Sequence, residues 1–78
     1  MGSPVPLSQM KPGQRGRIFS LEGGSGFRTR LISMGLAEGT EVRVIRSSGA
    51  GPILVESGGA RLALGRGMAD RIIVDGLS

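Results

Sequence analysis

Short runs of hydrophobic residues, separated by turns rich in glycine, make up most of this chain. Apolar side chains alternate or cluster in five segments typical of β-strands: residues 15–22, 40–46, 52–57, 60–64 and 71–74. Two glycines, Gly58 and Gly59, separate the third and fourth of these segments, which predicts a tight hairpin. The pattern therefore predicts a mainly β chain of about five strands.

One segment after the first strand has the spacing of a helix instead. Its apolar side chains fall at i, i+4 and i+7 and form one stripe: Phe27, Leu31 and Met34. Ser25 precedes this stripe, and its hydroxyl is expected to cap the first turn. Gly35 is expected to end the helix in the left-handed conformation, with Leu36 packing back on Leu31. We therefore expect one short helix between the first two strands.

The chain of 78 residues is long enough for one domain. Residues 1–6 are expected to form a flexible N-terminus and residues 7–75 a single domain. Only Phe19 and Phe27 are aromatic, so the core must be built from aliphatic side chains. Five short strands in so few residues predict a small, strongly bent barrel, whose closure would protect the strand edges.

The residue types exclude most catalytic and metal-binding arrangements. The chain has no Cys and no His, so disulfides, thiolate metal sites and Ser–His or Cys–His nucleophiles are excluded. The six acidic residues are spread along the chain without the spacing of a metal site. The glycine-rich residues 23–26 lack the phosphate-binding pattern of nucleotide sites, and a turn is favoured there. We therefore assign no catalytic, cofactor or metal residue, and expect no enzyme and no small-molecule substrate.

Nine Arg and one Lys outnumber the six acidic residues and give a net charge of +4. The excess fits a solvated basic surface, or attraction to an acidic partner, nucleic acid or an anionic membrane. The arginines are dispersed among acidic residues and Phe19 is the single aromatic expected at the surface, which disfavours nucleic acid. Arg28 and Arg30 flank the apolar stripe of the helix and are expected to reach solvent. With exposed apolar residues, these arginines form a candidate partner-binding set: Arg28, Arg30, Ile45 and Leu54.

A longer motif points to a family. Residues 30–44 read Arg-Leu, two residues, Met-Gly-Leu, two residues, Gly and then an alternating strand. This arrangement resembles the signature of ferrous iron transport protein A (FeoA), and residues 7–13 and 68–74 resemble the beginning and end of that family. The resemblance extends over nearly all of residues 7–75. It implies an SH3-like barrel and a role in bacterial ferrous iron uptake alongside the membrane GTPase FeoB.

The expected function is therefore that of an accessory protein that binds and modulates FeoB. No apolar run approaches the length of a membrane span, and the N-terminus does not resemble a signal peptide. A cytoplasmic protein, recruited to the inner face of the membrane, is expected. Two alternatives stay open, namely a basic barrel that binds nucleic acid and an interaction module like those of iron-dependent repressors. An uncovered sheet edge could also support a homodimer.

Overall fold

The computed structural model describes residues 3–47 and 49–77, which form one antiparallel sheet with three short helices. Within these residues the strands are β1 (Val5–Pro6), β2 (Arg15–Leu21), β3 (Glu41–Ser47), β4 (Ile53–Ser57), β5 (Ala60–Leu64) and β6 (Ile72–Gly76). The helices are a 3-10 turn η1 (Leu7–Gln9), α1 (Ser25–Ser33) and α2 (Arg66–Ala69). The predicted mainly β fold, with a short helix after the first long strand, is confirmed.

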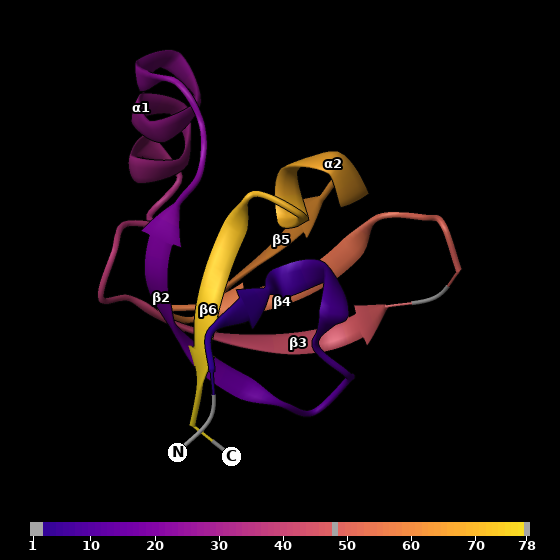
Figure 1. The fold of residues 1–78 in the computed structure, drawn as a ribbon. Helices are drawn as coiled ribbons and strands as arrows, with labels where there is room; N and C mark the ends of the chain where they lie inside the picture. Colours follow the sequence, from indigo (N-terminus) through magenta and orange to yellow (C-terminus); the bar gives the residue numbers. More distant parts are fainter. Residues whose placement is uncertain (1–2, 48, 78) are drawn as a thin grey trace.

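The strand order in this part of the chain is β1-β6-β2-β3-β4-β5, and the sheet curls around its core (Figure 1). The expected closure into a complete barrel is wrong, because no pair joins β1 to β5 among the described residues. β1 has only two residues, and both pair with β6, Val5 with Val74 and Pro6 with Ile73. Both of them lie in the segment that the sequence pattern assigned to the N-terminus. Within the part of the chain that the structure describes, β5 therefore keeps an unpaired edge.

Among the described residues, the buried core consists of aliphatic side chains and Met10. They come from every β-strand except β1, from the three helices and from the connections between them. Alternate residues of the strands face inward, and the largest buried side chains are Leu7, Leu31, Leu36, Ile53, Leu64, Ile72, Val42, Val44, Val55 and Val74. The pairing register shifts between Ile18 and Ser20, and this bulge leaves Phe19 61% exposed. A second shift between Val44 and Arg46 places Ile45 outside the β3–β4 ladder. The bulges increase the bend of a sheet that has to wrap a small core.

Helix α1 ends as expected and begins differently. Gly35 has a φ of +88°, and the Leu36 N–H donates to the Leu31 carbonyl at 2.9 Å. The Gly35 N–H donates to the Ile32 carbonyl at 2.9 Å, which completes the predicted Schellman ending. The predicted cap at Ser25 is wrong, since the helix begins one residue earlier. Gly24 is the N-cap and Ser25 is the first helical residue, with no side-chain cap hydrogen bond.

The predicted hairpin between β4 and β5 is confirmed. Gly58 and Gly59 have φ values of +59° and +83°, which suit the two central residues of a type I′ turn. The turn sets a register in which Glu56 lies opposite Arg61 and Val55 opposite Leu62. Because Val55 is buried, Glu56 and Arg61 project from the outer face of the sheet.

Candidate functional site

A pocket of about 350 Å³ opens where β2, β3 and the β4–β5 hairpin meet. Its lining consists mainly of charged side chains and of the glycines at the hairpin tip: Arg15, Glu41, Val42, Arg43, Glu56, Ser57, Gly58 and Gly59. We call it the charged pocket. The buried Val42 is the one aliphatic side chain in this lining, so the pocket offers little apolar surface to a ligand.

The charges of this pocket belong to a row of side chains that crosses four strands. Arg15 lies opposite Arg43, Arg43 opposite Glu56, and Glu56 opposite Arg61. The adjacent positions Gly16, Val42 and Val55 are buried, so the alternation of strand residues directs the row outward. Three arginines and one glutamate therefore lie side by side on the outer face of the sheet.

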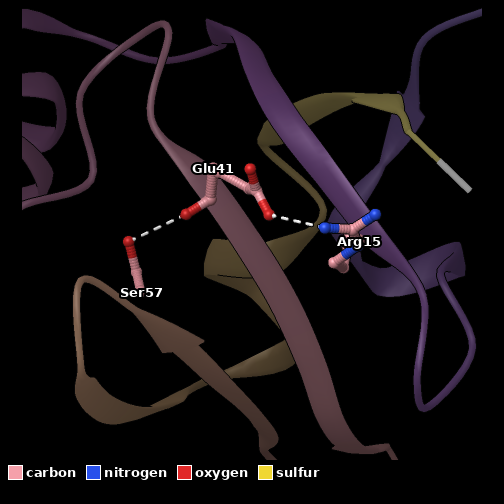
Figure 2. Close-up of polar contacts among 3 residues, drawn as sticks. All are labelled: Arg15, Glu41 and Ser57. Atoms are coloured by element: carbon pink, nitrogen blue, oxygen red, sulfur yellow. Dashed lines mark hydrogen bonds and ion pairs between the residues drawn. The ribbon is translucent and has the colours of Figure 1, made fainter.

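Glu41 stands beside this row and is held from both sides (Figure 2). Its carboxylate accepts from the Arg15 guanidinium at 3.4 Å, and its backbone carbonyl accepts from the Ser57 hydroxyl at 3.0 Å. The backbone pairing of β3 with β4 ends at Arg43 and Glu56. The Ser57 hydroxyl therefore connects the two strands beyond the last backbone pair. The two side chains of the ion pair are 50% and 46% exposed. An ion pair that exposed stabilises a protein by about 0–1 kcal/mol, so a competing anion can displace the Glu41 carboxylate.

Arg15 and Arg43 are like charges in directly opposite positions, an arrangement that destabilises a sheet. Although Glu56 faces Arg43 from the other side, no ion pair joins them in the part of the chain that the structure describes. An anionic group placed between Arg15 and Arg43 could accept from both guanidinium groups, since Arg binds carboxylate and phosphate through several N–H donors. The pocket therefore presents two guanidinium groups beside the carboxylates of Glu41 and Glu56.

The described contacts of the pocket and of the acidic side chains are of structural kinds. The Ser57 hydroxyl donates to a backbone carbonyl, so it is not poised against a general base. Residues 3–47 and 49–77 contain no group of three acidic side chains close enough to hold a metal ion. The same residues include no helix with the length and apolar character of a membrane span.

The four partner-binding residues predicted from the sequence do not form one surface. Arg28 donates to the Leu21 carbonyl at 3.2 Å and lies 3.6 Å from the Glu38 carboxylate, so it joins α1 to two neighbouring segments. Arg30 is exposed on the same helix. Ile45 and Leu54 are half-buried on β3 and β4. Because β2 and β3 are antiparallel, Ile45 and Leu54 lie toward the end of the sheet where β2 begins, whereas Leu21 ends β2. Helix α1 follows the end of β2 (Figure 1).

We expect replacement of Arg28 by alanine to lower the free energy of unfolding by about 1 kcal/mol, because one hydrogen bond and one half-exposed ion pair are lost. Chemical denaturation measures this change. Arg30→Ala is the matched control on the same helix, and its exposed side chain should change stability by less than about 0.5 kcal/mol. Equal effects of the two substitutions would show that the Arg28 contacts do not stabilise the fold.

Sequence reasoning did not single out Arg15, Glu41 or Glu56. The two-glycine turn does carry one usable signal, because counting outward from it places Glu56 opposite Arg61. The other pairings depend on how β2 and β3 align across the 19-residue connection between them, Glu22 to Thr40, which no local pattern specifies.

Comparison with known proteins places the chain among proteins of ferrous iron transport. The family model "FeoA domain" matches residues 5–76. A protein of Methanocaldococcus jannaschii that carries the name Fe(2+) transport protein A is 36% identical over 70 residues, which cover 90% of this chain and 84% of that protein. The crystal structure of an iron uptake regulatory protein (FeoA) is 43% identical, with a TM-score of 0.91 over 96% of this chain and all of that one.

A third relative bears on the architecture and on metals. The crystal structure of Stenotrophomonas maltophilia FeoA complexed with zinc is 26% identical, with a TM-score of 0.77 over 95% of this chain and 91% of that one. That protein is described as a prokaryotic SH3 domain protein, which confirms the SH3-like architecture expected here. This chain has neither His nor Cys, and so lacks two of the three kinds of ligand that zinc takes in proteins.

Proposed function

This chain belongs to the FeoA domain family, and from that premise we propose that it is an accessory protein of ferrous iron transport that binds the membrane GTPase FeoB on its cytoplasmic side and modulates its activity. The observation that carries the proposal is the family match over residues 5–76, together with 43% identity to a solved FeoA structure over that structure's whole length. The relative from M. jannaschii, which carries the name of an Fe(2+) transport protein, supports the same role.

The surface of the domain is consistent with a role exercised through contact with a partner. The charged pocket presents guanidinium groups that are only weakly paired, and β5 leaves one edge of the sheet open. Phe19 is a large apolar side chain exposed at a bulge. Such features serve recognition, because they supply charge, unpaired backbone groups and apolar area without reacting groups.

Uptake of radioactive ferrous iron tests the proposal. In cells that carry the cognate transporter but lack their own copy of this protein, expression of the chain should change the uptake rate several-fold relative to an empty vector. The sign of the change tells whether the protein activates or restrains transport. Cells that also lack the transporter are the control, and the chain should have no effect there.

Two results would contradict the proposal. The first is an unchanged uptake rate in cells in which the folded protein accumulates. The second is an equal change in cells with and without the transporter, which would mean that the protein acts elsewhere. Co-purification of the transporter from solubilised membranes with a tagged form of the chain would add the evidence for direct binding.

A further inference from the structure

From the charged pocket we infer that this face of the sheet binds an extended segment of a partner protein in which an acidic and a basic residue lie two positions apart. The inference deepens the proposed function, because it names the chemistry of the docking partner, and it rests on that function for its biological meaning. Its physical basis is the arrangement of charge on the sheet, and that basis can be tested with the purified protein alone.

The acidic residue of the segment is expected to lie between Arg15 and Arg43. Arg15 and Arg43 are directly opposite on β2 and β3, and both side chains line the charged pocket. Among the described residues, Arg15 has one ion-pair partner, Glu41, at 3.4 Å and half-exposed, and Arg43 has none. A carboxylate seated between the two guanidinium groups would remove their repulsion and accept several charge-assisted hydrogen bonds.

The basic residue of the segment is expected to lie over Glu56. Neighbouring strands lie about 4.8 Å apart, so the midpoint between Arg15 and Arg43 is about 7 Å from Glu56 on β4. Side chains two residues apart on one face of an extended segment are separated by about 6.7 Å. On a segment that crosses the strands, a basic residue two positions from the acidic one therefore lies over Glu56. The next acidic position along the segment reaches toward Arg61 on β5.

The mixture of signs argues against a nucleic acid as the occupant. A strand of nucleic acid presents uniform negative charge, and it would meet the carboxylates of Glu41 and Glu56 beside the arginines of the pocket. The lining contains no aromatic side chain on which a base could stack. A protein segment can alternate its charges to match the surface.

A second copy of this chain also fits poorly. Glu41 and Arg43 have the required spacing of an acidic and a basic residue, but both belong to β3, which is paired on one side with β2 and on the other with β4. They line a recess, so two copies would present two hollows to each other. A segment that protrudes from its own protein can enter this recess, so the expected partner presents an exposed strand or loop.

Titration of the isotopically labelled protein with synthetic peptides tests the inference. The probe is Ser-Thr-Glu-Thr-Lys-Thr-Glu-Thr-Ser, and the comparison peptide exchanges every Glu for Lys and the Lys for Glu. We expect saturable amide shifts at the pocket residues with the first peptide and at least tenfold weaker binding of the second. The double variant Arg15→Glu/Arg43→Glu should weaken binding of the first peptide at least tenfold, because the acidic residue that Arg15 and Arg43 receive would then meet two carboxylates, while Glu56 and Arg61 are unaltered.

Arg46→Glu is the matched control, since Arg46 is exposed on the same strand but does not line the pocket. It should change peptide affinity less than threefold. Four outcomes would overturn the inference: equal binding of both peptides, the same shifts with inorganic phosphate alone, tighter binding of a single-stranded oligothymidine at these residues, or the same shifts on concentrating the protein by itself.

Uptake measurements then separate this inference from the function on which it rests. If the unaltered chain changes iron uptake and the folded double variant does not, the result supports both the proposed function and the docking of the partner at the charged pocket. If both proteins change uptake equally, the pocket is not where the partner docks, and only this inference falls. If the unaltered chain has no effect, the proposed function falls, and the peptide titration still decides whether the pocket recognises a segment with an acidic and a basic residue two positions apart.

Discussion

Replacement of Leu31 by alanine is expected to lower the free energy of unfolding by about 3 to 4 kcal/mol. Leu31 is fully buried in the core, and its carbonyl accepts the hydrogen bond that closes the ending of α1. Truncation of a buried leucine removes apolar contacts and leaves a cavity, which together cost about 2–5 kcal/mol. In a domain of this size, the loss corresponds to a fall of roughly 15 °C or more in Tm, which calorimetry measures.

Ile32→Ala is the control for this prediction, because Ile32 is the next residue of the same helix and is 50% exposed. Its truncation should cost less than about 1 kcal/mol, since little apolar area is buried there. If the two substitutions lower stability equally, α1 is not packed on the sheet through Leu31.

Replacement of Gly16 by alanine should lower the free energy of unfolding by about 2 to 3 kcal/mol, an effect that arises from a close approach between strands. A Cβ atom at Gly16 would lie 2.2 Å from Val74 Cγ1 and 3.0 Å from the Asp75 carbonyl oxygen. The Val74 side chain is fully buried, and the carbonyl belongs to the backbone of β6, so neither can move freely. Overpacking of this kind commonly costs about 1–3 kcal/mol. Urea denaturation of the purified variant measures the change.

The same substitution at Gly26 provides the comparison. Gly26 lies in the first turn of α1, no atom lies within 4 Å of the position of an added Cβ, and its φ is not positive. Gly26→Ala should therefore leave stability unchanged or raise it by up to about 1 kcal/mol through helix propensity. A stable Gly16→Ala variant would show that β2 and β6 are less closely packed than the structure describes.

Local sequence patterns predicted those parts of the fold that local interactions determine. The Schellman ending at Gly35 and the hairpin at Gly58 and Gly59 each depend on a few adjacent residues. The apolar stripe of α1 was also predicted correctly, with Leu31 buried and Phe27 and Met34 packed against the core. The predicted helix start at Ser25 was wrong because both serine and glycine are favoured N-cap residues, and the two are adjacent here. Gly24 has the extended backbone conformation of an N-cap, so Ser25 is the first residue of the helix.

Parts of the structure that depend on distant pairing were not predictable from local pattern. β1 has two residues, one of them proline, so it shows no alternation, and it is a strand only because β6 lies beside it. The charged pocket has the same origin, since Arg15, Arg43 and Glu56 come from three separate strands. Their juxtaposition follows from the strand register, which no local pattern specifies.

The position of β6 between β1 and β2 has a consequence for how the domain folds. The last strand of the chain lies between its first two, so that Val74 lies opposite both Val5 and Ile18. Nearly the whole polypeptide has to be closed into a loop before these contacts form, which carries an entropic cost that local hairpins do not meet. Chains with such a high contact order fold slowly, and an intermediate that contains only the β4–β5 hairpin has little stability of its own. Folding of this domain is therefore expected to be all-or-none, with a rate set by the meeting of its two ends.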